Sequence, residues 1–210
     1  MKPNRTTPRR PATRRVPLSP KVIGRPRDTR IDMEVVEAVL NALERGGYRA
    51  VTMDGIAKKA DRPRSSLYRR WSSKRHLVAY AVVSELGENP AADTGTLRGD
   101  LLSAVRTLWR AFRGPLGHAL AGLVADMAQD AALASIIRQH VLTPRRRSMR
   151  EAIERARVRG EVGDDLDVEL LLDMLTGPFY FRTLFGHASM SRENTEQIVD
   201  CMLRVINPII

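Results

Sequence analysis

The stretch RPRSSLYRRW, residues 62–71, concentrates side chains that bind anions. Its four arginines carry guanidinium groups, which bind phosphate or the O6/N7 edge of guanine through two parallel hydrogen bonds. Ser65 and Ser66 add hydroxyls that hydrogen-bond to bases or phosphates. No Asp or Glu occurs from residue 62 to residue 76, whereas an ordinary surface helix mixes both signs of charge. The residue types favour a polyanion as partner, and the plain alternative is a solvated basic surface.

A helical conformation divides these side chains between two faces. At about 100° per residue, Leu67 and Trp71 lie within about 40° of each other, and we expect them to define the buried side. The groups on the other side are those that DNA recognition uses. They are hydroxyls, guanidinium groups and a phenol, from Ser65, Ser66 and Arg69, with Tyr68 and Arg70 flanking them.

Two short helices joined by a tight corner are expected at this place. Thr52 is a good N-cap for a helix over residues 53–60. Asp61 tolerates the left-handed conformation of a corner, and Pro63 suits the first position of a helix over residues 63–70. This arrangement describes a helix-turn-helix.

Two longer helices flank the short pair. Residues 28–46 place apolar side chains at three- and four-residue steps, and Gly46-Gly47 ends that helix. Ser72-Ser73 precede a further helix that runs to Leu86. We therefore assign residues 28–86 to a three-helix helix-turn-helix DNA-binding domain with a fourth helix at its end.

Residues 1–27 form a basic arm. They hold nine Lys or Arg, no acidic residue and a Pro every few positions. Such a segment cannot bury enough apolar surface to offset its ordering entropy, so we expect it to be disordered. Two interpretations stay open: a solubilising tail, or an arm that places Arg25 and Arg27 in a minor groove of DNA.

The excess of positive over negative charge lies in the N-terminal part of the chain. The 210 residues carry a formal net charge of +11. Residues 1–86 hold 20 Lys or Arg and 8 Asp or Glu, while residues 87–210 hold 15 and 16. Excess positive charge favours acidic partners, so one part of the chain is suited to a polyanion and the other to a different task.

The remainder of the chain is predicted to be helical throughout. Residues 87–96 are rich in Gly, Pro, Asn and Asp and are predicted to be a linker. No segment shows the alternation of a strand, so we expect an all-α protein of about nine helices, with residues 97–210 as the larger C-terminal domain. The helices predicted there cover residues 97–112, 116–128, 131–159, 166–185 and 192–206.

Cysteine usage and hydropathy indicate the compartment. Cys201 is the only cysteine, so no disulfide forms within one chain, which suits a reducing cytoplasm. No apolar run approaches the roughly 18–20 residues of a membrane span. The arginine-rich start resembles an organelle transit peptide, but its prolines oppose the amphipathic helix that such a peptide needs. The basic segments lack a hydrophobic insertion face, which disfavours a membrane-surface protein.

The sequence offers no catalytic constellation. The four histidines lack metal-ligand spacing, and we find neither a Gly-rich phosphate loop nor a convincing nucleophile–base set. We therefore expect neither an enzyme nor a bound metal or cofactor.

Residues 28–80 resemble the N-terminal DNA-binding domain of the TetR/AcrR family of bacterial transcription regulators. The resemblance rests on a helix that ends in GGY, followed by VTMDGIAKKA, SSLYRRW and SSKRHLV. In the second half, RARVRGEV and then a long helix with GPFYFR resemble the effector-binding domains of the same family. The resemblance covers most of residues 28–206 and is strongest over the first third.

Carried over by position, the resemblance implies DNA contacts for a defined set of residues. The corner departs from the family, which has Gly and an apolar residue there, so we expect Arg62 to point outward as a further phosphate contact. Pro63 stands where a Ser or Thr N-cap is usual. The implied contacts are to bases or nearby backbone for Arg64, Ser65, Ser66 and Arg69, and to phosphates for Thr52, Arg62, Tyr68, Arg70 and Lys74.

The resemblance also implies a homodimer, formed by the last two helices as a four-helix bundle. Residues 168–185 are apolar on more than one side, which agrees with a second buried face. The alternative is a central core helix within one monomer. Cys201 is expected to pack as a small apolar residue.

A small-molecule pocket inside the C-terminal domain is likewise implied by the resemblance. Methionines and aromatic side chains fill adaptable pockets, although residues of these types are more often plain core than ligand contacts. The candidate lining residues are Trp109, Phe112, His118, Met127, Met149, Met174, Phe179 and Tyr180.

The function predicted in this way is that of a sequence-specific DNA-binding transcription regulator. We expect a repressor that a small-molecule effector releases from a palindromic double-stranded operator, located in the bacterial cytoplasm and on the nucleoid when bound to DNA. The alternative is a sequence-neutral architectural protein of the nucleoid.

Overall fold

The computed structural model describes residues 29–86, 92–163 and 165–206. Within these ranges the regular structure is helical throughout, with ten α-helices and one π-helical turn, which confirms the all-α prediction. The predicted disordered arm with Arg25 and Arg27 lies outside the described residues, as do residues 87–91 of the predicted linker. No helix in the described part of the chain combines the length and apolar character that a membrane span needs.

The N-terminal helices follow the predicted order. The first helix loses helical geometry at Gly46 and Gly47, where the φ of Gly47 is +64°, so the predicted stop is confirmed. A residue with a side chain is strained at such a φ, whereas Gly is not. The elements are α1 (Thr29–Ala50), α2 (Met53–Lys59), α3 (Arg64–Arg70) and α4 (Lys74–Leu86).

The corner between α2 and α3 is built as the sequence indicates, with one shift. The Gly55 N–H donates to the Thr52 hydroxyl over 3.0 Å, which confirms Thr52 as the N-cap of α2. Asp61 takes a left-handed conformation with a φ of 50°. Pro63 has an extended ψ of 140° and is the N-cap of α3, so its prediction as the first helical residue is wrong by one position.

The second half contains the predicted helices, one of them interrupted. The stretch expected as a single helix over residues 131–159 contains a π-helical turn just before Pro144. Pro lacks an N–H and its ring clashes with the carbonyl four residues earlier, and a widened turn relieves this clash. The elements are α5 (Leu97–Arg113), α6 (Pro115–Met127), α7 (Ala131–Ile137), η1 (Arg138–Leu142), α8 (Thr143–Val158), α9 (Val168–Phe185) and α10 (Arg192–Ile206).

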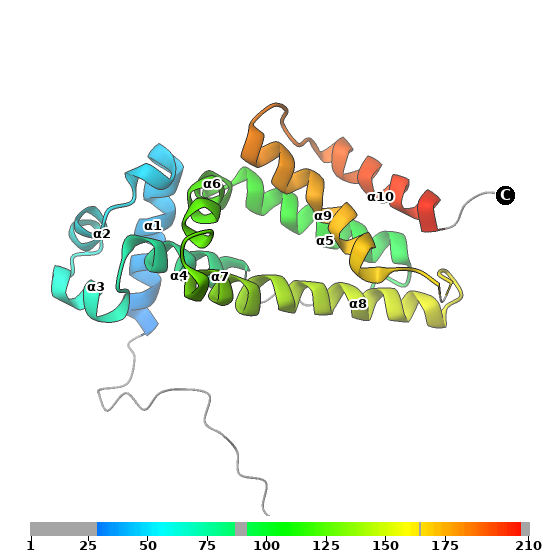
Figure 1. Cartoon of the computed structure of the whole chain (residues 1–210), viewed down its shortest axis with the longest axis horizontal. Coiled ribbons are helices and arrows are strands. Elements are labelled where there is room, and N and C mark those ends of the chain that lie inside the picture. The colour runs from blue at the N-terminus through cyan, green and yellow to red at the C-terminus, as the bar shows by residue number, and fades with distance from the viewer. Residues whose placement is uncertain (1–28, 87–91, 164, 207–210) are drawn as a thin grey trace, which may run out of the picture.

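Two hydrophobic cores fill the interior, and their boundary differs from the predicted linker. The first core joins α1–α4 to α6, α7 and η1 through buried residues that include Leu123, Ile137 and Val141. The second core lies among α5, α8, α9 and α10, with Phe179 as its largest fully buried side chain. Figure 1 shows α6 standing beside α1, apart from α10 at the far end of the molecule. The helix-turn-helix therefore shares a core with part of the C-terminal half.

The last residues of the predicted linker are fixed to the second core. The Thr94 N–H and hydroxyl both donate to Asp100 of α5, over 2.7 and 2.8 Å. Arg155 of α8 donates to the Ala92 carbonyl over 2.6 Å. Thr96 caps α5 through the Gly99 N–H. Residues 92–96 thus form an ordered entry into α5.

Candidate nucleic-acid interface and ligand cavity

Helix α3 presents a polar face to solvent because two large side chains anchor its other face. Leu67 is 1% exposed and Trp71 is 6% exposed, as the helical spacing predicts. The Trp71 ring packs on Tyr80 of α4 with 5.3 Å between ring centroids. The opposite side leaves Ser65 and Arg69 exposed, with Tyr68 at 45% exposure and Ser66 partly buried.

Arg64 stands at the start of this face and is bound from two sides. Its guanidinium pairs with Asp54 of α2 and lies 5.8 Å from the centroid of the Tyr68 ring. Both partners of the ion pair remain more than half exposed, at 61% and 59% of their side chains. Exposed pairs of this kind are weak, so Arg64 stays available to an anion that competes with Asp54.

Arg62 and Arg70 face the protein. Arg62 binds Glu34 of α1 over 2.5 Å with its side chain 29% exposed, so the expectation that it points outward is wrong. Arg70 binds Asp32 of α1, and both side chains are less than one-fifth exposed. These acids of α1 attract the two arginines inward and tie both ends of α3 to the first helix. A phosphate contact by Arg70 remains a prediction.

Lys74 and Thr52 lie on either side of the motif. The Lys74 ammonium sits 4.2 Å from the centroid of the Tyr48 ring, in a cation–π geometry. Burial lowers the pKa of Lys74, and the Asp126 charge acts in the opposite direction. The Thr52 hydroxyl is occupied by its capping bond. Phosphate contacts by both residues stay predictions.

Tyr48 centres a polar junction between the helix-turn-helix and α6. Its hydroxyl donates to Asp126, and burial together with this bond raises the pKa of Tyr48 well above its ordinary value. Gly122 of α6 lies directly beneath the ring, since a Cβ built there would stand 2.3 Å from a ring carbon. Arg75 of α4 pairs over 3.2 Å with Asp130, the cap of α7.

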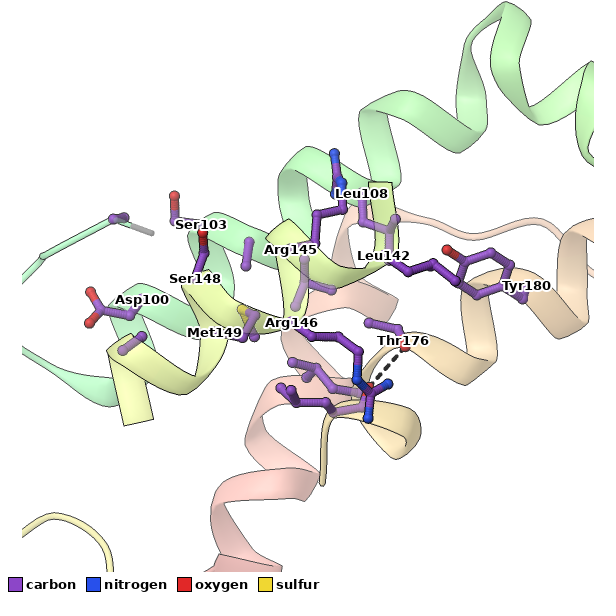
Figure 2. A pocket seen from close by; sticks show the side chains of 16 residues that line it. Asp100, Ser103, Leu108, Leu142, Arg145, Arg146, Ser148, Met149, Thr176 and Tyr180 are labelled. Carbon is purple, nitrogen blue, oxygen red and sulfur yellow. Dashed lines mark hydrogen bonds between the residues drawn. The ribbon is translucent and has the colours of Figure 1, made fainter. Parts of the chain in front are cut away.

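A first cavity of about 130 Å³ lies between α5, α8 and α9. Figure 2 shows Asp100, Ser103 and Ser148 at one end of it and Tyr180 at the other, with Arg145 and Arg146 between. Apart from Thr176, the rest of the wall is apolar and includes Ala104, Val105, Leu108, Leu142, Met149, Ala152, Leu172 and Leu175.

A second cavity of about 490 Å³ adjoins the first and reaches the helix-turn-helix core. The two share Leu142, Arg146, Thr176 and Tyr180 as lining residues. Val82 and Leu86 of α4 close one side, and the larger volume lies within the roughly 300–1,000 Å³ of small-molecule sites. Further apolar lining comes from Phe112, Leu116, Leu120, Leu123, Val124, Met127, Ile137 and Val141.

Half of the predicted pocket residues line these cavities. Phe112, Met127, Met149 and Tyr180 do so. The other four do not, and each has a different environment. Trp109 donates to the Met190 carbonyl, His118 lies 3.3 Å from the Leu43 carbonyl at the α1–α6 contact, Met174 is 42% exposed on the outside, and Phe179 is core.

The two arginines of the lining are not among the predicted pocket residues. Arg145 and Arg146 belong to the run PRRRS, which reads as a solvated basic stretch. Their helical spacing from Met149 and Ala152 was the available signal, because residues three or four apart share a face. Arg146 pairs with Glu169 and Asp173 of α9, over 2.5 Å in each case.

An apolar strip covers the outer face of α9. Phe181 and Phe185 stack with 4.8 Å between centroids although they are 55% and 71% exposed. Leu170 and Leu184 extend the strip. Val205 and Cys201 of α10 are also exposed, so the expectation that Cys201 packs as a small apolar residue is wrong for the single chain. Contiguous exposed apolar surface of this kind marks an interaction site.

Both halves of the chain match families of known proteins. Residues 35–81 match the family described as bacterial regulatory proteins, tetR family, and residues 91–202 match the tetracyclin repressor-like C-terminal domain. The uncharacterized HTH-type transcriptional regulator YdeS of Bacillus subtilis is 29% identical over 162 residues, which cover 77% of this chain and 82% of that protein.

Two further relatives agree with this match. The DNA-binding transcriptional repressor TetR of Mycobacteroides abscessus is 28% identical over 176 residues, 83% of this chain and 93% of the relative. The crystal structure of the TetR family transcription regulator SCO0332 superposes with a TM-score of 0.66 and 30% identity, and the match covers 85% of this chain and 99% of that one.

Proposed function

The chain belongs to the TetR family of bacterial transcriptional regulators, and we propose that it is a repressor that leaves its operator when a small molecule fills the cavities. The observation that carries this proposal is the shared core. Val82, Leu123, Ile137 and Val141 line the larger cavity and also belong to the core that holds α1–α4. A ligand in that cavity therefore contacts the packing that positions α3.

The proposed DNA contacts follow the exposed face of α3. Ser65 and Arg69 reach base edges in the major groove, and Arg64 joins them once an anion displaces Asp54. Tyr68 contacts phosphate at the edge of the face. Arg62 and Arg70 act on the protein side by holding α3 against α1. Of the four arginines in residues 62–71, only Arg64 and Arg69 therefore contribute to DNA binding in this proposal.

We propose that two chains associate through α9 and α10. The exposed apolar strip of α9, from Leu170 to Phe185, supplies a self-complementary surface of the kind that a two-fold interface buries. Two recognition helices held about 34–36 Å apart then read successive major grooves of a palindromic operator. This partner is chromosomal DNA, which would place the protein in the bacterial cytoplasm.

Effector release follows from differential affinity. A ligand that binds more tightly to a conformation with differently placed α3 helices shifts the population toward that conformation. Operator affinity then falls by up to the ratio of the ligand's affinities for the two conformations. In the proposed mechanism the shift passes through α6, where Tyr48, Asp126 and Gly122 join the two parts of the chain. The effector is the only small molecule that the proposal requires.

The proposal is tested by selecting the bound DNA from a random duplex pool with the full chain. We expect a palindromic sequence that binds roughly 10³-fold or more tightly than random duplex. Binding should weaken steeply between 50 and 200 mM salt, because each neutralised phosphate releases counterions. Enrichment of no sequence would refute the repressor and support the architectural alternative.

A further inference from the structure

The first cavity contains a cation that has no acidic partner in the described residues. Arg145 of α8 lines this cavity and is partly buried, and its Nε donates over 3.3 Å to the Leu86 carbonyl at the end of α4. Within the described ranges no carboxylate forms an ion pair with it. A guanidinium removed from water without a counter-ion is unfavourable, so such a group marks a place for an anion.

The other charged groups around the cavity are compensated. Arg146 binds Glu169 and Asp173. Asp100 is 2% exposed and is bound by Thr94 and, over 3.2 Å, by Arg155. Among the described residues, Arg145 is therefore the charged group of the cavity wall that has no oppositely charged partner. Burial lowers the pKa of Arg145, which is the expected effect on a cation in poorly solvated surroundings.

A hydrogen-bond donor lies close to this cation. Tyr180 of α9 lines both cavities, and its hydroxyl makes no hydrogen bond among the described residues. Burial raises the pKa of its phenol, and the Arg145 charge acts in the opposite direction, which places the two groups within electrostatic reach. At neutral pH the phenol therefore keeps its proton and can donate it in a hydrogen bond.

The space beyond this pair is largely apolar, and the two charged residues that line it, Arg146 and Asp173, form an ion pair with each other. Tyr180 forms part of the border between the two cavities, and the larger one extends from it along Phe112, Leu120 and Met127. A ligand that fits both therefore needs a single anionic end and an apolar body. Guanidinium binds carboxylate in a bidentate geometry, and the phenol supplies one further donor.

We propose that the effector is an amphipathic acid whose carboxylate binds Arg145 and the Tyr180 hydroxyl, with its apolar body in the larger cavity against Val82 and Leu86. This inference rests on the proposed function, since it names the chemical class of the molecule that controls DNA binding. It assigns the polar contact to α8 and α9 and the apolar contact to α4.

The test uses pairs of probes that differ only in charge. Binding of dodecanoate and dodecan-1-ol, and of 4-phenylbutyrate and 4-phenylbutan-1-ol, is measured by calorimetry on the full chain. We expect at least one acid to bind about 10-fold or more tightly than its alcohol. Arg145→Gln should lower the affinity for that acid by roughly 10- to 100-fold, the range for a hydrogen bond to a charged group, and leave the alcohol unchanged. Arg150→Gln is the matched control, because Arg150 lies on the same helix but binds Glu169 and does not line either cavity.

A second measurement needs no ligand. Arg145→Gln should leave the Tm of the free protein unchanged or raise it, while Arg155→Gln should lower it because Asp100 loses its partner. A fall in Tm with Arg145→Gln equal to that with Arg155→Gln would show that Arg145 is already compensated and would overturn the proposal. Glu88→Gln is measured in the same way, because Glu88 lies outside the residues for which the ion pairs of Arg145 are described. A fall in Tm with Glu88→Gln equal to that with Arg155→Gln would also overturn the proposal.

DNA binding separates this inference from the proposed function. If wild-type protein keeps sequence-specific DNA binding but neither acid binds more tightly than its alcohol, the effector class is wrong and the repressor stands. If an acid binds through Arg145 but does not release the selected DNA, the site is correct and its regulatory role is refuted. Arg145→Gln should itself keep wild-type affinity for the selected DNA.

Discussion

The contact of Gly122 with Tyr48 leads to a prediction about the junction between α6 and the helix-turn-helix. A Cβ at position 122 would stand 2.3 and 2.4 Å from two ring carbons of Tyr48 and 2.9 Å from its Cβ. Real Cβ atoms do not approach so closely, and the near end of the side chain cannot swing away alone. Gly122→Ala therefore forces Tyr48 or α6 to move.

The magnitude combines two opposed effects. Overpacking of this kind costs about 1–3 kcal/mol, whereas Ala in place of Gly within a helix is favourable by about 1 kcal/mol. The swap Ala121→Gly with Gly122→Ala keeps the composition of α6 and nearly cancels the second effect, because residue 121 is an exposed neighbour in the same helix. We expect the swap variant to lose about 1–3 kcal/mol, with Tm lower by about 2–4 °C for each kcal/mol.

The assay is thermal and urea denaturation of the swap variant, of Ala121→Gly and of wild type. Tyr48→Ala removes the obstacle, so in a Tyr48→Ala background the swap should cost little stability, and the double-mutant cycle isolates the contact. A swap variant with the Tm of wild type would refute the close approach. Operator affinity, measured on the same proteins, should fall with the swap because Tyr48 carries the Asp126 bond and lies under Lys74.

Three other predictions address the DNA face, the acid dependence and the dimer. Arg69→Ala should lower operator affinity by about 1–3 kcal/mol in competition binding, and equal losses on all sequences would demote Arg69 to a phosphate contact. Burial raises the pKa of Asp100, but hydrogen bonds from Thr94 outweigh it and hold the pKa below its ordinary value, so this group stabilises the fold above about pH 4 and the contribution is lost on further acidification. Asp100→Asn should therefore flatten the acid limb of stability against pH in urea titrations, and an unchanged limb contradicts the assignment. Phe185→Asp should shift sedimentation toward monomer while Val158→Asp, exposed on α8, should not.

The local parts of the fold could be predicted because they depend on neighbouring residues. Helical spacing alone places Leu67 and Trp71 inward and Arg69 outward, and the structure agrees. Thr52 and Asp61 have the cap and corner geometry that their residue types favour. These features need no knowledge of the tertiary structure.

The two arginine orientations could not be predicted, because their causes are distant in sequence. Arg62 and Arg70 bind acids 28 and 38 residues away on α1. The position of each arginine within the motif is the same whether its side chain faces phosphate or carboxylate, so local sequence does not distinguish the two. The sequence thus supplies the charges of the motif, and only the packing of α1 shows which arginines pair with acids of that helix.

The lining residues of the cavities could not be predicted from sequence either. Met149 and Met174 are equally plausible lining residues by type, yet one lines the first cavity and the other is exposed on the outer face of α9. Arg145 looks like a solvated residue within a basic run, and only its docking against α4 reveals its place in the cavity. The family resemblance implies that a pocket exists, but residue type does not predict which side chains line it.

On the proposed mechanism, the boundary between the two cores gives a ligand a way to act on a distant helix. The covalent linker separates residues 28–86 from the rest, but packing joins α6, α7 and η1 to the helix-turn-helix. The larger cavity lies where this enlarged unit meets α5 and α9, since Leu123 and Val141 line one side while Phe112 and Tyr180 line the other. We expect a ligand bound there to change the separation of the two units and to leave the geometry inside each one intact. On the proposed mechanism, α3 therefore keeps its base-reading face in both states, and only the distance between the two α3 helices of a dimer changes.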